Sequence, residues 1–432
     1  MRKMKDTEKR LIELRRDFHK HAESMWKEYR TASIVARHLM TLGIPVVMGD
    51  DLSVKGMQFQ YPPEEKIAEE KRRAISQGAE PELVEKMCGL PGVMGIIDTG
   101  KEGPVTAFRF DIDALPFSET DAPEHRPVKE NYVSVNGGSC HACGHDGHTA
   151  IGMIVAEELM KRKDSLRGRI KLIFQPAEEG GGGARGIVER GCLDDVDYFF
   201  AGHLGLTRLD GKPLPSHGII GGTKDFLDSR RYNIIYKGKA AHPCGNPNDG
   251  KNALLASCVA ALGIHTIPPH CQGEFHQNVG VMHAGSSRNT IAADSYMEVE
   301  VRGENDIVAE YGEKKMLSVV KGAAEAYEVE CDVVLIGKSS SGASDDKAIE
   351  IVMRCARTIP WFTEFHDVGS VGGSDDASEM LRRVQKNGGV GSYIGLGADF
   401  TASFHDKAFD FDEGVLAPSV ELFVKMVEDI HS

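Results

Sequence analysis

The sequence predicts an α/β fold into which a smaller α+β domain is inserted. Three observations favour it. Strand-like apolar runs alternate with helical stretches in the first half, the order changes to βαββαβ in the middle, and α/β character returns near the C-terminus. The 432 residues are 41% hydrophobic and 27% charged, with 48 glycines, a composition typical of globular proteins. A chain of this length buries a core that needs no disulfide or metal for folding.

The first half contains the elements expected of the larger domain. Helical spacing of apolar residues over 7–42 predicts two helices, which Gly43 and Pro45 end. The segment 50–92 is rich in Glu, Lys and Arg, which predicts a solvated helical insertion. Strand-like runs and one helical stretch follow at 95–98, 105–110, 149–162 and 170–174. This alternation is expected of a mostly parallel sheet.

Residues 229–340 are expected to form the inserted domain. Strand-like and helical segments follow one another at 232–236, 252–266, 278–282, 296–301, 308–327 and 329–336. Their order, βαββαβ, is that of a ferredoxin-like domain, in which two helices cover one face of a four-stranded antiparallel sheet. The larger domain is then made of residues 1–228 and 341–432.

Charge and cysteine content exclude several classes of function. The chain has 51 Lys and Arg against 65 Asp and Glu, a formal charge of -14, and no basic stripe, so no nucleic-acid partner is expected. It lacks a stretch of about eighteen apolar residues, so no membrane association is expected. The first forty residues carry charges throughout and contain no apolar core of the kind found in a signal peptide. The nine cysteines do not follow the regular spacing of a small disulfide-bonded domain. These features predict a cytoplasmic protein with reduced thiols.

The densest group of potential metal ligands is segment 140–148, Cys-His-Ala-Cys-Gly-His-Asp-Gly-His, before a helix predicted to begin near Thr149. Cys143 and His145 lie two positions apart, so that a thiolate and an imidazole can hold one metal ion or a pair of ions. A nearby carboxylate can orient the imidazole. The alternative is a polar loop with a reactive cysteine at a helix start.

Two adjacent acids, Glu178 and Glu179, directly follow the apolar strand-like run 171–174. One carboxylate can bind a metal while its neighbour acts as a general base. Ligand sites in open α/β sheets lie beyond the carboxyl ends of strands, which favours this interpretation over a solvated acidic loop.

Three isolated histidines, His203, His242 and His405, complete the set of candidate residues. Taken singly, each is more typical of a structural or surface position. His203 follows the apolar run 198–201, again at the end of a predicted strand.

Taken in order, these motifs resemble the M20 family of metallopeptidases and amidohydrolases, and in particular its thiolate-containing, aminoacylase-like branch. The matching segments are 108–116, 143–148, 176–180, 201–203 and 409–413. The resemblance implies a zinc-peptidase-like catalytic domain and an inserted lid and dimerisation domain. It also implies an enzyme: a two-metal amidohydrolase that cleaves the amide bond of N-acyl or N-aroyl amino acids of the p-aminobenzoyl-glutamate kind.

The resemblance assigns the metal ligands as well. Cys143 is expected to bridge two divalent ions, with His145 and His203 on one ion and Glu179 and His405 on the other. A thiolate favours zinc, whereas carboxylate and imidazole accept manganese, so the ions are expected to be zinc or manganese.

Further roles follow from the same resemblance. Glu178 is the expected general base, which takes a proton from the attacking water and returns it to the departing amine. Asp113 matches the family's orienting acid near the metal histidine. Asp111 stands where other M20 branches have a metal histidine, a departure that His145 compensates in this branch.

The substrate-binding groups implied in the inserted domain are His242, Asn289 and Arg302. His242 matches a histidine that crosses the dimer interface, and Arg302 offers a guanidinium fork that suits a substrate carboxylate. We expect Asn289 and Arg302 to lie on adjacent strands of one sheet. The expected partners are a small N-acyl amino acid and a further protein chain, in a homodimer or in a heterodimer with a related protein.

Two other functions stay open. A general aminoacylase or a dipeptidase would use the same reaction centre with a different acyl pocket. A non-catalytic partner of a hydrolase complex is the alternative of another class, and the intact ligand set argues against it.

Overall fold

The structure is a computed structural model and describes residues 2–432. It forms two compact units. Unit 1 comprises Met1–Lys224 and Ala343–Ser432, and unit 2 comprises Asp225–Gly342. In the described residues no helix is both long and apolar enough to cross a membrane.

Unit 1 contains a nine-stranded sheet with the strand order β1-β2-β4-β3-β5-β13-β7-β12-β6. The strands are β1 (Val46–Met48), β2 (Val93–Asp98), β3 (Val105–Asp111), β4 (Arg169–Gln175), β5 (Tyr198–Leu204), β6 (Thr207–Arg208), β7 (Gly218–Thr223), β12 (Glu364–Ser370) and β13 (Val390–Leu396).

The four central strands of this sheet, β4, β3, β5 and β13, pair in parallel. Antiparallel pairs flank them, β2 with β4 on one side and β7 with β13 on the other. The expected parallel arrangement is therefore found at the centre of the sheet. Every residue of β3 is buried, as expected where both faces of a sheet are covered.

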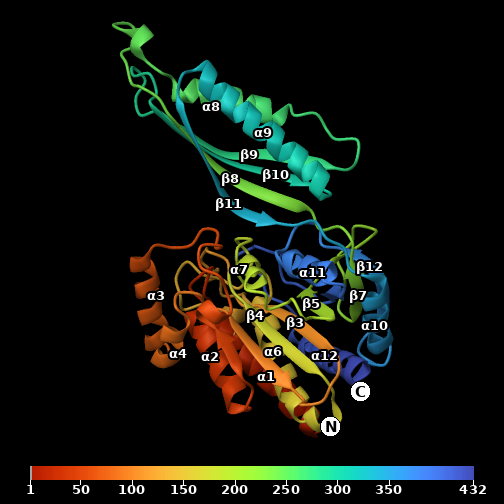
Figure 1. Cartoon of the computed structure of the whole chain (residues 1–432). Coiled ribbons are helices and arrows are strands. Elements are labelled where there is room, and N and C mark those ends of the chain that lie inside the picture. Colours follow the sequence, from red (N-terminus) through yellow and green to blue (C-terminus); the bar gives the residue numbers. More distant parts are fainter. Residues whose placement is uncertain (1) are drawn as a thin grey trace. The chain divides into compact units, whose positions relative to one another are not determined.

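Two groups of helices pack on this sheet. The helices of unit 1 are α1 (Arg2–Lys20), α2 (Tyr29–Thr41), α3 (Glu64–Ser76), α4 (Pro81–Lys86), α5 (Arg126–Lys129), α6 (His145–Met160), α7 (Gly183–Glu189), α10 (Asp346–Ala356), α11 (Ala377–Lys386) and α12 (Leu416–His431). Helix α6 packs on β3 and β4 and contacts α1, α2 and α12 (Figure 1). Helix α11 packs on β5 and β13 and contacts α7.

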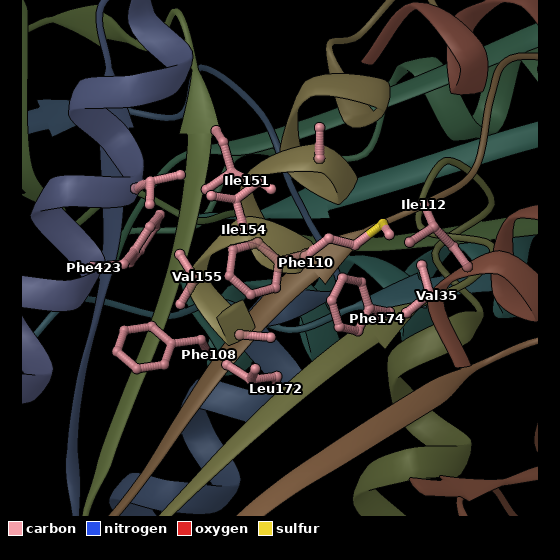
Figure 2. Packing of buried hydrophobic residues seen from close by; sticks show 14 of the residues in the cluster. Val35, Phe108, Phe110, Ile112, Ile151, Ile154, Val155, Leu172, Phe174 and Phe423 are labelled. Carbon is pink, nitrogen blue, oxygen red and sulfur yellow. The ribbon is translucent and has the colours of Figure 1, made fainter. Parts of the chain in front are cut away.

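Aromatic side chains between α6, α12 and the central strands form part of the core (Figure 2). The ring of Phe110 on β3 lies 5.5 Å from that of Phe174 and 5.6 Å from that of Phe423. Gly152 lets α6 approach these rings, because a Cβ there would lie only 2.6 Å from Phe110. This close packing fixes the N-terminal end of α6 relative to the carboxyl ends of β3 and β4.

The segment 50–92 forms α3 and α4, as its composition predicts, and both helices pack on α2. Each buries a few apolar side chains, including Ile67, Ala74 and Val84, and exposes its charged residues.

Unit 2 contains a four-stranded antiparallel sheet with the strand order β11-β8-β10-β9. Its elements are β8 (Asp228–Lys237), α8 (Ala253–His265), β9 (Phe275–Ala284), β10 (Asp294–Gly303), α9 (Asp306–Ala326) and β11 (Glu330–Ser339). Helices α8 and α9 contact each other and the sheet, and a separate core of buried residues fills the space between them. Burial alternates along β9 and β11, so one face of the sheet lacks a helical cover within this unit.

Candidate metal centre

The ligand-rich segment 140–148 leads directly into α6, which begins at His145 rather than near Thr149 as predicted. The correction has a local cause: Gly144 adopts a left-handed conformation, with φ of +89°, and ends the preceding loop one residue before His145. His145 and His148 therefore lie one turn apart at the helix start. The position of His145 is then fixed by the packing of α6 on the sheet.

His145 points one ring nitrogen at the candidate centre. Its Nδ1 lies 2.9 Å from the backbone oxygen of Asp113 and 3.4 Å from Oδ1 of the same residue. Its Nε2 is buried and has no hydrogen-bond partner among the described residues. An orphaned nitrogen of this kind, with the other nitrogen engaged, is the arrangement of a metal-binding histidine.

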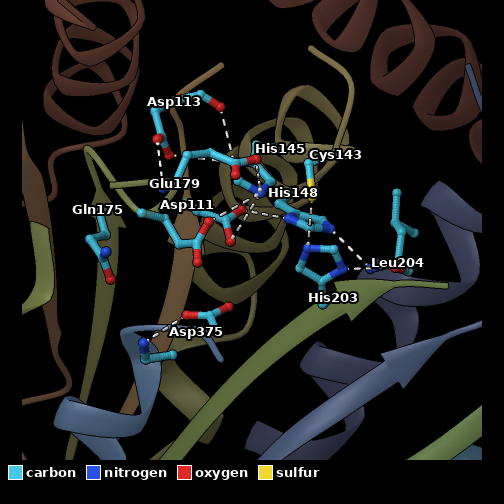
Figure 3. Close-up of polar contacts among 12 residues, drawn as sticks. Asp111, Asp113, Cys143, His145, His148, Gln175, Glu179, His203, Leu204 and Asp375 are labelled. Carbon is cyan, nitrogen blue, oxygen red and sulfur yellow. Dashed lines mark hydrogen bonds and ion pairs between the residues drawn. The ribbon is translucent and has the colours of Figure 1, made fainter. Parts of the chain in front are cut away.

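Cys143 and His203 lie beside His145 (Figure 3). His203 is the sixth residue of β5, and its Nε2 lies 3.5 Å from Cys143 Sγ. The backbone oxygen of Leu204 accepts a hydrogen bond from Nδ1 of His203 at 2.7 Å, which leaves Nε2 as the nitrogen that can bind a metal ion. Burial lowers the pKa of His203 to about 3, so this imidazole is neutral at physiological pH.

Glu179 and His405 form the other part of the cluster, with Glu179 Oε2 3.4 Å from His405 Nε2. The backbone N–H of Glu179 donates to Asp113 Oδ2 at 3.0 Å, so one carboxylate supports both Glu179 and His145. Ligand atoms of Cys143, His145 and His203 lie within 4.8 Å of one another, and so do those of Cys143, Glu179 and His405. These two groups share Cys143.

Glu178 lies beside a buried network of charges. Its carboxylate lies within 4.8 Å of those of Asp375 and Asp376, and 3.9 Å from His145 Nε2. Burial, and next the negative charge of Asp375, raise the pKa of Glu178 well above the ordinary value of a glutamic acid. The guanidinium of Arg109 contacts Asp375, Asp376 and Asp111 and balances part of this charge.

His148 is buried beside the cluster, but both of its nitrogens are engaged. Nδ1 lies 2.5 Å from Asp111 Oδ1, and Nε2 accepts the backbone N–H of Leu204 at 3.1 Å. Asp111 also bonds to Arg109 at 2.5 Å. His148 and Asp111 are therefore bonded to other groups of the chain, although their ligand atoms and that of His145 also lie within 4.8 Å of one another.

Asp146 of the same motif anchors α6 to the N-terminal helix. Its carboxylate lies 2.7 Å from Arg15 Nε and 2.8 Å from His19 Nδ1, and all three side chains are fully buried. Arg15 also binds Asp410, 264 positions after Asp146 in the chain, at 2.6 Å. The ligand loop is thus held by segments from both ends of the chain.

The residues present fit a centre of two divalent ions. Burial alone would lower the pKa of His145, yet the charge of Asp111 and neighbouring groups raises it well above its usual value, so the cluster favours a positive charge at this point. Burial, and then Glu179, raise the pKa of the Cys143 thiol, so a thiolate here needs a cation as partner. The buried Nε2 of His145, which has no hydrogen-bond partner among the described residues, is available to bind such a cation.

The three candidates in unit 2 lie on its surface. His242 is exposed, and its Nδ1 accepts the backbone N–H groups of Cys244 and Gly245, at 3.1 and 3.0 Å. Arg302 lies on β10 and contacts Glu300 at 3.0 Å. Asn289 lies in the loop between β9 and β10, so the prediction that it shares a sheet with Arg302 on adjacent strands is wrong. Ser-Ser-Arg-Asn is too polar and too short of β-branched residues to extend β9.

Sequence reasoning missed the support that Arg109, Asp375 and Asp376 give to the candidate centre. Asp375 and Asp376 form an adjacent acid pair after Gly-Gly-Ser, much as Glu178 and Glu179 follow a strand. That similarity is the only local signal, and it is weak because adjacent acids are common on surfaces.

A cluster of thiol, imidazole and carboxylate groups beside a further glutamate is typical of one class of protein, the metal-dependent hydrolases. Residues 107–429 match the profile described as Peptidase family M20/M25/M40. The chain belongs to this family. The predicted family and its hydrolase class are confirmed.

Two curated relatives cover almost the whole chain. An indole-3-acetyl-aspartic acid hydrolase of Enterobacter agglomerans is 41% identical over 95% of this chain and 93% of its own length. One of the subunits of the p-aminobenzoyl-glutamate hydrolase of Escherichia coli (strain K12) is 39% identical over 96% of this chain and 94% of its own. The segments 50–92, 238–242 and 409–413 already predicted a likeness to this kind of hydrolase, and the likeness is confirmed.

Two solved structures are similar to the chain over almost its whole length. The aminobenzoyl-glutamate utilization protein from Klebsiella pneumoniae has a TM-score of 0.83 and 35% identity, covering 99% of this chain and 97% of its own. A Bacillus subtilis protein described as a dinuclear metal binding peptidase from the M20 family has a TM-score of 0.69 and 25% identity, covering 99% of both chains.

Proposed function

We propose that the protein is a two-metal amidohydrolase that cleaves the amide bond between an aromatic acyl group and an acidic amino acid, of the p-aminobenzoyl-glutamate type. The observation that carries this proposal is the pair of ligand groups that share Cys143, beside a glutamate that belongs to neither of them. The names of both curated relatives describe an aromatic acyl group joined to aspartate or glutamate, which supports this substrate class.

Under this proposal His145 and His203 would hold one ion, Glu179 and His405 would hold the other, and Cys143 would be a ligand of both. The side chains that carry these ligand atoms already lie together in the described chain. Zinc and manganese both suit this donor set. When bound, the ions polarise the amide carbonyl and lower the pKa of water.

The chain's own residues move the proton. Glu178 accepts a proton from the attacking water and delivers it to the amide nitrogen, whose bond to the carbonyl carbon then breaks. Burial and the charges of Asp375 and Glu179 raise the pKa of Glu178, which favours its binding of a proton, while the nearby imidazole of His145 lowers this pKa. Asp113 orients His145 so that Nε2 faces the centre.

We assign substrate binding to His242, Asn289 and Arg302. The local partners of His242 engage Nδ1 and leave Nε2 to donate to a developing oxyanion. Arg302 has one carboxylate contact, to Glu300, and its planar fork has donors left for a substrate carboxylate. Lys224, Arg230 and Arg231 are each paired with an acid of the chain, so we assign none of them to the second carboxylate of a glutamate substrate.

We further propose that unit 2 is a ferredoxin-like lid and dimerisation domain, made of residues 229–340, inserted between the parts 1–228 and 341–432 of a zinc-peptidase-like catalytic domain. Its element order and antiparallel sheet support this assignment. Leu255, Val259 and Leu262 form an exposed apolar stripe on α8, with exposures of 43, 43 and 70%. Strand β9 is an edge strand of its sheet. A second copy that pairs at this edge, or a related protein in a heterodimer, would cover both features.

A cytoplasmic location also belongs to this proposal. All nine cysteines lie in the described residues as free thiols, which supports a reducing compartment.

A substrate panel on purified, metal-loaded protein tests the function. We expect kcat/KM for p-aminobenzoyl-glutamate and indole-3-acetyl-aspartate to exceed that for N-acetyl amino acids and dipeptides by about tenfold or more, the effect of a few specific contacts. Equal rates on N-acetyl amino acids would indicate a general aminoacylase instead. No hydrolysis of any of these compounds by protein that holds two ions per chain would indicate a non-catalytic partner of a hydrolase complex.

A further inference from the structure

Glu178 and Glu179 lie on one short loop, residues 176–182, between the end of β4 and the start of α7. The loop folds back on itself: a Cβ at Gly183 would lie 1.7 Å from the backbone oxygen of Pro176. The two ends of the loop are therefore in direct contact. Inside the loop, Gly181 and Gly182 donate backbone hydrogen bonds to Glu178 and Ala177.

Asp376, which immediately precedes α11, binds both ends of this loop. Its Oδ2 accepts the backbone N–H groups of Gly183 and Ala184 at 3.0 and 2.9 Å. Its Oδ1 accepts Gln175 Nε2 at 2.6 Å and Arg109 Nη2 at 3.3 Å. Gln175 is the last residue of β4, and Gly183 is the first of α7. One carboxylate thus closes the loop from both sides.

We infer that Asp376 is a positioning residue for hydrolysis, whose carboxylate holds the loop that carries Glu178 and Glu179 in its working geometry. The inference rests on the proposed roles of these two glutamates. Asp376 is 1% exposed and all four of its partners are donors, so an amide in its place would turn an N–H group toward another donor. The requirement at this position is for a carboxylate and not only for a polar side chain of that size.

Two other buried carboxylates hold the middle of the same loop. Glu28 Oε1 accepts the backbone N–H of Ala177 at 2.8 Å, where the chain has a positive φ of 54°. Asp113 Oδ2 accepts that of Glu179. These contacts fix the centre of the loop and explain how a residue in the left-handed region persists there. Asp376 instead binds the last residue of β4 and the first N–H groups of α7, so its loss should loosen the ends of the loop without removing these contacts.

The test compares Asp376→Asn with Asp375→Asn by hydrogen exchange and by kinetics. Asp375 is the matched control for exchange, since it is also buried, with 5% exposure, and binds Arg109 and Tyr393 but no backbone group of the loop. In metal-free protein, Asp376→Asn should raise the exchange rate of the peptide 176–184 about tenfold or more, with α6 and α12 unchanged. Asp375→Asn should leave this peptide as in the wild type.

In metal-saturated protein, Asp376→Asn should lower kcat by about 10- to 100-fold and leave KM within about threefold, as for other groups that orient a metal centre. Asp376→Glu, which keeps the carboxylate, should recover part of kcat. Gln175→Met removes the hydrogen bond between the end of β4 and Asp376, and it replaces Asp376→Asn in the test if that variant does not fold. It should lower kcat by about threefold or more.

The inference would be overturned if Asp376→Asn left both the exchange rate of peptide 176–184 unchanged and kcat within about twofold of wild type. If Asp376→Asn does not fold, the same two results in Gln175→Met would overturn it. Glu178→Gln is measured in parallel. If Glu178→Gln is inactive while Asp376→Asn or Gln175→Met is unaffected, only the positioning role of Asp376 is refuted. If Glu178→Gln is active, the proposed general base is refuted, and the inference with it.

Discussion

The candidate residues of unit 1 and those of unit 2 are supported in different ways. In unit 1, His145 and His203 are buried, and each has its second nitrogen bonded to a backbone oxygen. In unit 2, His242 and Asn289 are exposed, and the side chains of both form hydrogen bonds with groups two or three positions away. The fold of unit 1 therefore positions the candidate metal ligands, whereas the substrate-binding candidates of unit 2 have only local support.

This difference predicts which replacements change the metal content and which change the kinetics of hydrolysis. Buried, pre-oriented ligands bind ions without reorganisation, and their loss should change metal content. Exposed residues with local partners should change kinetics and leave the metal content as it is. The predictions below test this division, beginning with the largest effect.

Replacement of His203 by Ala should remove one ion per chain and lower activity by about 1,000-fold or more, since it deletes a ligand and not only an outer-shell group. His148→Ala is the matched control, because the ring of His148 lies 4.9 Å from that of His203 but both of its nitrogens are engaged. It should keep two ions at saturating metal. Elemental analysis decides, and loss of an ion in His148→Ala but not in His203→Ala would reverse the assignment.

In unit 2, His242→Ala should lower kcat by about 100- to 1,000-fold, the usual effect of a lost oxyanion donor, with KM less affected and both ions retained. If His242 serves the active site of a neighbouring chain, mixing His242→Ala with Glu178→Gln should restore activity, because a mixed dimer has one site with both groups intact. Two inactive variants that demonstrably exchange protomers and stay inactive would rule out this shared site.

The buried support of α6 makes stability depend on pH through His19. Burial and Arg15 lower the pKa of His19, but hydrogen bonds to Asp146 and Glu119 raise it to about 9 overall. A folded-state pKa above the unfolded value stabilises the protein fully below about pH 6.5, and this stability is lost as the pH rises through about 9. The loss should amount to about 3 kcal/mol in urea unfolding of metal-free protein. His19→Gln should abolish this part of the pH dependence, and an unchanged slope would contradict the ion pair.

The smallest expected effect concerns Arg302. Arg302→Ala should lower kcat/KM for substrates with a free α-carboxylate by about 1.5 to 3 kcal/mol, the worth of a charged hydrogen bond. A matched amide or ester substrate should lose far less. Equal losses on both substrates would show that Arg302 supports β10 through Glu300 and does not bind the carboxylate.

The sequence predicts the regular elements of both units where apolar periodicity is strong, as in β8, α8 and α9. Strands β7 and β12 have no such pattern, because Gly-Ile-Ile-Gly-Gly-Thr and Glu-Phe-His-Asp-Val-Gly-Ser combine glycines and polar residues. They become strands by pairing with each other in parallel. Helix α7, Gly-Ala-Arg-Gly-Ile-Val-Glu, has two glycines and a low helix propensity, and its first N–H groups bind Asp376 from a distant segment.

The same limit applies to the candidate site. Cys143, His145, Glu178 and Glu179 lie in local motifs, so residue type and spacing are sufficient to propose them. The partners that hold them lie far away in the chain: Asp376 is 201 positions from Gln175, and Asp410 is 395 positions from Arg15. No local pattern encodes such contacts, since they arise only when the strands and helices pack.

Two adjacent glutamates provide the most direct test of the central claim, that unit 1 holds two ions and a separate base. We compare Glu178→Gln with Glu179→Gln, which make the same change one residue apart, and measure ions per chain together with kcat. Glu178→Gln should keep both ions and lose at least about 100-fold in kcat, because an amide cannot accept the proton of water. Glu179→Gln should lose an ion and regain part of its activity with excess metal. A Glu178→Gln variant that turns over within about threefold of wild type, or that loses an ion while Glu179→Gln keeps two, would contradict the account.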